Sequence, residues 1–277
     1  KLHGAQITLK FPSVGATENI LLAAVKATGD TVITGAAREP EVIALCEFLT
    51  ACGASIEGMG SPELIIHGGG DLHGTRYTVP TDRIVAGTYL FGCIGCGGRV
   101  LLNQAPWSQM EAVTVAAERM GAQCTVSEEG LFVQAPVRPK SIGHLQTGPY
   151  PEFPTDLQSP LLAVLATVPG KSIIKENIFE NRFKVCHELR KMGADIRVDG
   201  NTAIVCGGKL HGNCVYAEEL RGGAALLVAA LAAEGSSVIR DCSFIRRGYE
   251  DIGGDFKKLG GLITEDTGTV FYENIQL

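Results

Sequence analysis

An acidic residue stands just before an apolar run, in a stretch rich in proline. The stretch is GPYPEFPTDLQSPLLAVLA, residues 148–166, and its acid is Asp156. A helix N-terminus has unpaired N–H groups and the positive end of the helix dipole, so it favours an anion. Thr155 with Gln158 matches a capping box, and Pro160 cannot donate back to residue 156, which predicts an irregular helix start. Asp156 is therefore either a structural first-turn acid or a carboxylate placed for proton transfer.

Arginines follow in loops farther along the chain. Arg182 lies in ENIFENRF, Arg246 and Arg247 lie in FIRRGYED, and Arg221 lies in AEELRGGA. A single exposed arginine usually forms only a surface ion pair. Several arginines converging on one acid-bearing cleft would instead hold an anionic substrate.

Composition limits the classes of partner. The chain has 277 residues, 45% of them hydrophobic, with a net charge of -6 and a pI near 5.6. Its scattered basic residues form no stripe, so we expect no nucleic-acid partner. The longest apolar runs, such as residues 224–233, are shorter than the ~20 residues that a membrane span needs, and the N-terminus lacks a signal-peptide pattern. These features predict a cytoplasmic protein that does not enter the membrane.

The nine cysteines are too sparse for a disulfide scaffold, and an odd number cannot all pair. We expect reduced thiols. Cys93 and Cys96 form a C-x-x-C inside an apolar, helix-like run, without a second pair spaced as zinc ligands. The interpretation is that both are buried and structural, without a redox or metal function.

The sequence contains an internal repeat of about 70 residues. The tripeptide Leu-His-Gly occurs at residues 2–4, 72–74 and 210–212, and SIGHL at residues 141–145 occupies the remaining position. A second feature recurs with the same spacing of about 70 residues. Each amphipathic helix pattern ends at a glycine that can adopt the left-handed C-cap conformation. These glycines are Gly53, Gly121, Gly193 and Gly260. His3, His73 and His211 recur at one turn, which favours a local structural role over a metal site.

Each repeat is predicted to contain a strand, an apolar helix, a second strand, an amphipathic helix and a closing strand pair. The apolar helices, for example LLAVLA and AALLVAALAA, should be buried on all sides. The predicted class is α/β, with sheets outside a bundle of buried helices. No G-x-G-x-x-G joins a strand to a helix, so this is not a Rossmann fold.

The entrances to the four apolar helices differ in sequence, and function should lie where equivalent positions differ. They are FPSVGATEN, VPTDRIVAG, FPTDLQSP and AEELRGGA.

Six ordered motifs carry a family resemblance along essentially the whole chain. They are PSVGATEN, AAREPE, DRI.AGT, FPTD.Q, ENRF and RGYE. The sequence resembles UDP-N-acetylglucosamine 1-carboxyvinyltransferase, also called UDP-GlcNAc enolpyruvyl transferase. The resemblance implies a cytoplasmic enzyme of peptidoglycan synthesis that transfers the enolpyruvyl group of phosphoenolpyruvate to the 3-hydroxyl of UDP-GlcNAc and releases phosphate, without a cofactor.

The resemblance also assigns residues. Asp156 matches the general base that faces the sugar hydroxyl. Ser13, Val14 and Ile178 match positions that contact the UDP-sugar. Arg182, Arg221 and Arg247 match arginines of the phosphoenolpyruvate site. No residue of the chain matches the donor of a proton to the methylene carbon.

Members of this family have two lobes of three repeats each, whereas four repeats are visible here. Residues 1–80 are predicted to be the last repeat of the N-terminal lobe, without the two repeats before it, and residues 81–277 a complete C-terminal lobe. The orphan repeat would allow self-association. The chain alone is expected to be inactive; a non-catalytic paralogue that binds UDP-sugar or regulates a full-length enzyme, or a 5-enolpyruvylshikimate-3-phosphate synthase, are the alternatives.

Three positions depart from the family pattern. Glu219 stands where Asp is usual, Gly222-Gly223 replaces Ala-Ser, and Pro160 replaces a small residue. The glycine pair is expected to loosen the start of its helix by about 1 kcal/mol per glycine, close to Arg221.

Overall fold

The computed structural model describes residues 1–266 and 269–273. It divides into two compact units, each with its own hydrophobic core. The N-terminal unit comprises Lys1–Thr81 with Pro149–Glu152, and the C-terminal unit comprises Asp82–Gly148 with the chain from Phe153 onward.

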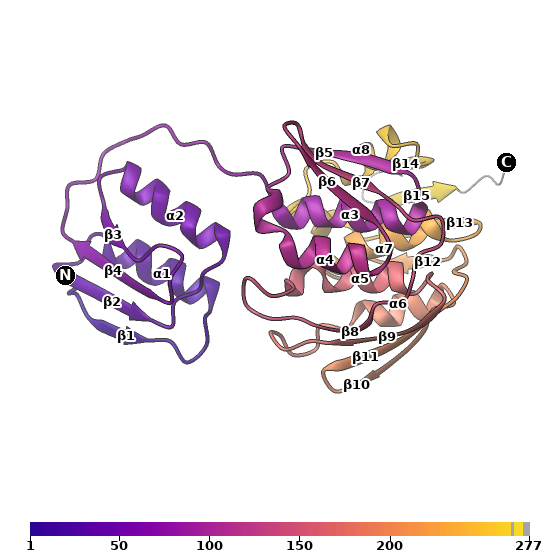
Figure 1. Cartoon of the computed structure of the whole chain (residues 1–277), viewed down its shortest axis with the longest axis horizontal. Helices are drawn as coiled ribbons and strands as arrows, with labels where there is room; N and C mark the ends of the chain where they lie inside the picture. The colour runs from indigo at the N-terminus through magenta and orange to yellow at the C-terminus, as the bar shows by residue number, and fades with distance from the viewer. Residues whose placement is uncertain (267–268, 274–277) are drawn as a thin grey trace. The chain divides into compact units, whose positions relative to one another are not determined.

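The N-terminal unit is one repeat, a four-stranded sheet with two helices (Figure 1). The strand order is β1-β2-β4-β3, with β1 parallel to β2 and the other neighbours antiparallel. Its elements, in chain order, are β1 (Gln6–Thr8), α1 (Val14–Ala24), β2 (Gly29–Thr34), α2 (Pro40–Ala51), β3 (Ser55–Glu57) and β4 (Glu63–Gly68).

The C-terminal unit contains three repeats. The second repeat of the chain has α3 (Arg83–Cys96), β5 (Arg99–Asn103), the short 3-10 helix η1 (Trp107–Gln109), α4 (Glu111–Arg119), β6 (Gln123–Ser127) and β7 (Gly130–Gln134). The third has β8 (Gly143–Gln146), η2 (Thr155–Leu157), α5 (Gln158–Leu165), β9 (Gly170–Lys175), α6 (Val185–Lys191), β10 (Asp195–Asp199) and β11 (Thr202–Gly207). The fourth has β12 (Cys214–Tyr216), α7 (Leu220–Ala232), β13 (Ser236–Arg240), η3 (Cys242–Arg247), α8 (Ile252–Lys258), β14 (Ile263–Asp266) and β15 (Thr269–Glu273).

The strand order of the sheets repeats along the chain, as the sequence predicts. The sheets β8-β9-β11-β10 and β12-β13-β15-β14 have the order and directions of the first sheet. All four predicted closing glycines, Gly53, Gly121, Gly193 and Gly260, have φ between 94° and 102°. Each therefore adopts the left-handed conformation that ends a helix without the steric cost of a Cβ atom.

The second repeat departs from the prediction, because its sheet β5-β7-β6 has three strands. The expected first strand after residues 72–74 is wrong, since no strand occurs between β4 and α3. This segment instead bonds to the N-terminal unit: the His73 N–H donates to the Cys52 carbonyl at 2.8 Å, and the Tyr77 hydroxyl donates to Glu47 at 3.0 Å. Its backbone is therefore not paired with β5.

The repeated tripeptide has a steric explanation in two of its copies. A Cβ atom on Gly4 or Gly212 would lie 2.0 Å from the carbonyl oxygen of Asp30 or Ser236, respectively, on the neighbouring strand. Glycine is needed at both places for this close approach of two backbones. Gly74 has no atom within 4 Å of such a Cβ among the described residues, which agrees with the loss of the strand there.

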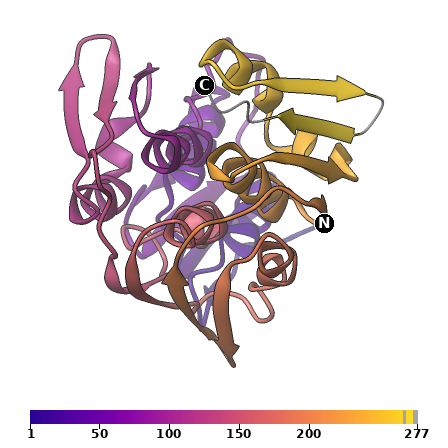
Figure 2. The ribbon, with the colours of Figure 1, turned by 90° about the vertical axis from the view of Figure 1, so that its right-hand side faces the viewer.

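Three apolar helices form the centre of the C-terminal unit. Helices α3, α5 and α7 pack against one another, and Figure 2 shows them end-on with the sheets outside. All eight residues of α5 are buried, as predicted. In this unit the enolpyruvyl-transferase-type arrangement, with helices inside and sheets outside, is confirmed.

Helix α1 does not follow this prediction. Only Thr17, Leu21 and Ala24 are buried, and Leu22 is 54% exposed. The reason is that α1 has no second apolar helix within its own unit, whereas each apolar helix of the C-terminal unit has two. Self-association through this repeat stays a prediction.

Candidate active site

The entrance to α5 is irregular, as Pro160 predicts. Residues Thr155–Leu157 form the 3-10 turn η2, and α5 begins only at Gln158. The predicted capping box is wrong, because the Thr155 hydroxyl donates to Oε2 of Glu176 at 2.9 Å. The Thr155 side chain is thus engaged away from the helix that it was expected to cap.

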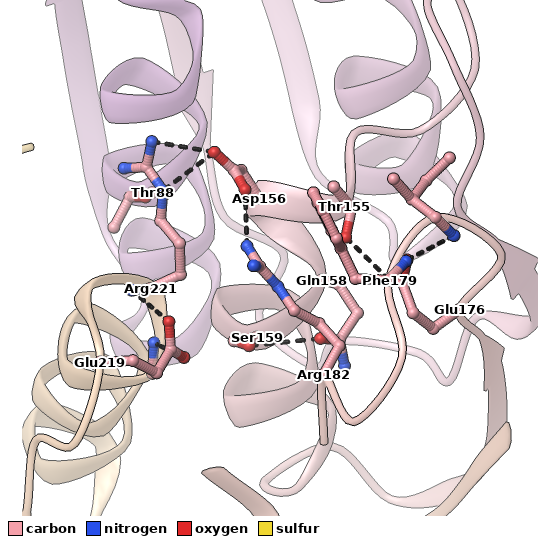
Figure 3. A network of polar contacts seen from close by, with 12 residues as sticks. Thr88, Thr155, Asp156, Gln158, Ser159, Glu176, Phe179, Arg182, Glu219 and Arg221 are labelled. Atoms are coloured by element: carbon pink, nitrogen blue, oxygen red, sulfur yellow. Dashed lines mark hydrogen bonds and ion pairs between the residues drawn. The ribbon is translucent and has the colours of Figure 1, made fainter. Parts of the chain in front are cut away.

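Glu176 joins this turn to the loop after β9. Its Oε1 accepts from the N–H groups of Ile178 at 2.8 Å and Phe179 at 3.0 Å, while Oε2 accepts from Thr155 (Figure 3). Glu176 is 2% exposed. A buried carboxylate with three donors fixes the geometry of all three groups, because leaving any of them unpaired is costly.

Asp156 lies between two arginines that come from different repeats (Figure 3). Its Oδ1 accepts from Nη2 of Arg182 at 2.5 Å. Its Oδ2 accepts from Nε of Arg221 at 3.2 Å and from Nη2 of the same residue at 3.1 Å. The predicted convergence of Asp156, Arg182 and Arg221 is therefore present, and the cluster carries one more positive than negative charge.

Glu219 holds the backbone beneath Arg221. It is the N-cap of α7, and its carboxylate accepts from the N–H groups of Arg221 and Gly222. A Cβ atom on Gly222 would lie 2.5 Å from Oε1 of Glu219, so glycine makes room for the longer acid. Helix α7 begins at Leu220 and buries both Gly222 and Gly223; the expected loosening of this helix start stays a prediction.

Tyr249, two residues after the end of η3, supports the Arg221 side chain. The Arg221 guanidinium carbon lies 5.6 Å from the Tyr249 ring centroid, and the Tyr249 hydroxyl is 2.7 Å from that of Thr88. Since Thr88 already donates to the Ile84 carbonyl, the phenol is the donor of this pair. Burial raises the pKa of Tyr249, against the opposing effects of Arg221 and Thr88, so the phenol keeps the proton that it donates.

Charge stabilises the arginine despite its burial. Burial acts to lower the pKa of Arg221, but the Asp156 carboxylate and then Tyr249 outweigh it, and the pKa is raised. The side chain of Arg221 is 11% exposed, that of Arg182 is 20% exposed and that of Asp156 is 37% exposed. The carboxylate is thus the most accessible member of the cluster.

Three buried N–H donors of this cluster have no hydrogen-bond acceptor among the described residues. They are Nε of Arg182, Nη1 of Arg221 and Nε2 of Gln158. Gln158 is completely buried, and its Oε1 accepts from the Ser159 hydroxyl at 3.2 Å. Unsatisfied buried donors are unusual in folded proteins and point to a site that takes an acceptor.

The other predicted site residues lie elsewhere. Ile178 is half-buried in the loop that Glu176 fixes, whereas Arg247 is exposed at the end of η3 and forms no ion pair with Asp156 within the described chain. In the N-terminal unit, Ser13 is the N-cap of α1 and accepts from the Ala16 N–H at 3.3 Å, and Val14 is the first residue of that helix. Their substrate contacts, and that of Arg247, stay predictions.

The cysteine interpretation needs one correction. All nine cysteines are free, as expected, but Cys93 is only half-buried and Cys96 is exposed. Cys96 is the last residue of α3, where Gly97 and Gly98 have positive φ values and turn the chain.

Within the described residues no three His, Cys, Asp or Glu side chains are grouped as metal ligands, and no helix there has the length and apolar character of a transmembrane segment.

Sequence reasoning missed the supporting residues. Glu176, Thr88 and Tyr249 act on the site through other side chains. Thr88 lies inside the DRI.AGT motif and Tyr249 inside the RGYE motif, and Glu176 opens the ENIFENRF loop, but none of these patterns showed which side chain each residue supports.

Known structures share this fold. The enolpyruvyl transferase NikO from Streptomyces tendae superposes with a TM-score of 0.84 at 25% identity, covering 98% of this chain and 66% of that one. EPSP synthase from Acinetobacter baumannii superposes with a TM-score of 0.70 at 21% identity, covering 93% of this chain and 63% of that one. The fold is that of the enolpyruvyl transferases.

Sequence comparison gives the family. The family described as EPSP synthase (3-phosphoshikimate 1-carboxyvinyltransferase) matches residues 1–256, and the chain belongs to it. The chain is 44% identical over 253 residues to UDP-N-acetylglucosamine 1-carboxyvinyltransferase of Nitratidesulfovibrio vulgaris, covering 91% of the chain and 61% of that protein. It is 43% identical over 267 residues to UDP-N-acetylglucosamine 1-carboxyvinyltransferase 2 of Staphylococcus aureus, covering 96% and 64%. The chain thus spans less than two thirds of the length of these relatives.

Proposed function

We propose that this chain provides the general base and part of the phosphoenolpyruvate site for enolpyruvyl transfer to UDP-GlcNAc, a step of peptidoglycan synthesis. The observation that supports this proposal is the Asp156 carboxylate held by Arg182 and Arg221 at the entrance to α5. Two guanidinium groups suit the carboxylate and phosphate of phosphoenolpyruvate. The proposed place of action is the cytoplasm.

In the proposed reaction, the oxygen of the sugar 3-hydroxyl bonds to carbon 2 of phosphoenolpyruvate while Asp156 takes the proton of that hydroxyl. A proton must also reach carbon 3, which gives a tetrahedral adduct. Loss of a proton from carbon 3 and cleavage of the bond from carbon 2 to the phosphate oxygen then release phosphate and restore the double bond. Arg182 and Arg221 would stabilise the anionic groups throughout, and Arg247 is proposed to join them.

Ser13, Val14 and Ile178 are proposed to contact the UDP-sugar. The support is the match of these residues to the sequence motifs, together with the 44% identical relative that is named for this substrate. The N-terminus of α1, where Ser13 and Val14 lie, is suited to an anionic group such as a diphosphate.

The test is an assay of the purified chain with both substrates. Phosphate release is expected to be absent, because no residue of this chain is assigned to protonate carbon 3. Calorimetry is expected to show binding of phosphoenolpyruvate that Arg221→Gln abolishes. If Arg221→Gln binds phosphoenolpyruvate as the parent chain does, the proposed site is wrong. Release of phosphate at an ordinary enzymatic rate would contradict the expected inactivity.

A second candidate is binding of a UDP-sugar without catalysis, or regulation of a full-length enzyme. It would rest on the N-terminus of α1, where Ser13 lies and which is suited to an anionic group, together with the lack of an assigned proton donor for carbon 3. Binding of UDP-GlcNAc without turnover, combined with retention of a full-length relative in a pull-down, would support it. Binding of shikimate 3-phosphate in place of UDP-GlcNAc would instead support the EPSP synthase reaction.

A further inference from the structure

We infer that Asp156 is an internal occupant of the anion site, and that an anionic substrate must displace it before it can act as a base. This inference rests on the proposed function and adds an order of events to it. In the present structure the same carboxylate that is proposed to take a proton neutralises the arginines that are proposed to hold the substrate.

The contacts show how the two roles compete for the same carboxylate. Each carboxylate oxygen of Asp156 is used by a different arginine, Oδ1 by Arg182 and Oδ2 by Arg221. Three of its roughly four acceptor sites are therefore taken by N–H donors, which compete with the hydroxyl proton. A phosphate or carboxylate of the substrate needs those same donors, because the forked guanidinium binds oxyanions through its paired N–H groups.

The surroundings allow the exchange. The Asp156 side chain is 37% exposed, against 20% for Arg182 and 11% for Arg221, so the acid lies on the open side of the pair. It belongs to the short turn η2, while Arg221 is anchored from beneath by the cap of Glu219. Arg221 is thus a fixed member of the cluster, and Asp156, its most exposed side chain, is the member that we expect to rotate away.

The cluster also has unused capacity for an acceptor. It carries two positive charges and one negative charge, and three N–H donors, Nε of Arg182, Nη1 of Arg221 and Nε2 of Gln158, are buried without an acceptor in the described chain. A single aspartate does not satisfy this set. A larger anion with more oxygen atoms, such as phosphoenolpyruvate, can engage more of these donors than Asp156 does.

The test compares the affinity for phosphoenolpyruvate of the parent chain and of Asp156→Asn. The amide keeps the size of the side chain but removes the competing charge, so we expect binding about fivefold to tenfold tighter, equivalent to about 1 kcal/mol. Glu180→Gln is the matched control, because Glu180 is an exposed acid on the loop of Arg182 and forms no ion pair with either arginine within the described residues. This control changes the net charge equally and should leave the affinity unchanged.

The outcomes separate this inference from the proposed function. If the parent chain binds phosphoenolpyruvate through Arg221 and Asp156→Asn binds it equally or more weakly, the displacement inference is wrong and the anion site stands. If neither form binds it, both proposals fail. Thermal unfolding with added inorganic phosphate provides a second measurement: the melting temperature of Asp156→Asn should rise more than that of the parent chain. Equal shifts would contradict the inference.

Discussion

At the residue scale, the site depends on side chains that hold other side chains. Glu176 ties the turn that bears Asp156 to the loop that bears Arg182, and Tyr249 ties Arg221 to Thr88. These contacts come from the third, fourth and second repeats. The polar cluster is therefore part of the packing among the three buried helices, and it cannot be altered without cost to that packing.

Replacing Glu176 by Ala should destabilise the C-terminal unit. The change leaves three donors without their carboxylate, those of Thr155, Ile178 and Phe179. We expect the free energy of unfolding in urea to fall by about 3 kcal/mol, given the usual cost of unpaired buried groups. Glu176→Gln retains an acceptor and should lose only about 1 kcal/mol. Equal stability of the Ala variant and the parent chain would show that the contacts contribute nothing.

His67 gives a pH-dependent contribution in the N-terminal unit. Its Nδ1 is 3.0 Å from Asp30 and its Nε2 is 3.2 Å from Glu57, and these hydrogen bonds and charges raise its pKa above the usual 6.5. A group with a raised folded-state pKa stabilises the fold fully below the unfolded-state pKa and loses this effect as the pH rises through the folded-state pKa.

An NMR titration of the histidine ring protons should therefore place the pKa of His67 above 6.5. Asp30→Asn should lower the pKa of His67, because the hydrogen bond to Asp30 contributes most to raising it. The exposed His187, which lies outside this sheet, provides the control and should not respond to the substitution. If Asp30→Asn leaves the His67 titration unchanged, the assigned cause is wrong.

At the scale of the elements, α3 approaches η2 closely because of one glycine. A Cβ atom on Gly87 would lie 2.3 Å from Cδ1 and 3.2 Å from Cγ of Leu157, a completely buried residue next to Asp156. Gly87→Ala should therefore overpack the core and reduce stability by about 1–3 kcal/mol, while weakening phosphoenolpyruvate binding through displacement of η2.

Gly15→Ala is the matched control for this prediction. Gly15 lies in α1 with no atom within 4 Å of a new Cβ in the described structure. The same substitution there should raise stability by up to about 1 kcal/mol, because alanine favours the helix. Urea denaturation of the two variants measures whether the free energy of unfolding falls for Gly87→Ala and rises for Gly15→Ala. A Gly87→Ala variant as stable as Gly15→Ala would contradict the steric argument.

The sequence predicted these elements well where the signal was local and repeated. The left-handed glycines and the irregular start near Pro160 each depend on a few adjacent residues. The prediction failed where the outcome depended on packing partners. The segment after β4 bonds to the N-terminal unit, and α1 lacks the neighbours that bury α5. Likewise, the sequence indicated Asp156 and its arginines, but not that the acid occupies their donors.

At the scale of the molecule, the two units have separate cores of different size. The core of the N-terminal unit is built around Leu21, Ile33 and Ile66, and that of the C-terminal unit is formed by all three of its repeats. A small domain buries a lower fraction of its surface than a large one, so its stability is lower. The N-terminal unit should therefore unfold first.

The single tryptophan makes this order measurable. Trp107 lies in the C-terminal unit, so its fluorescence reports only that unit, whereas far-UV circular dichroism reports both. In urea we expect a first dichroism change without a fluorescence change, followed by a second transition seen by both probes. Phosphoenolpyruvate should move only the second transition to higher urea, because a ligand stabilises the state that binds it and both Arg182 and Arg221 lie in the C-terminal unit. Coincident transitions by the two probes would show that the units unfold as one cooperative body.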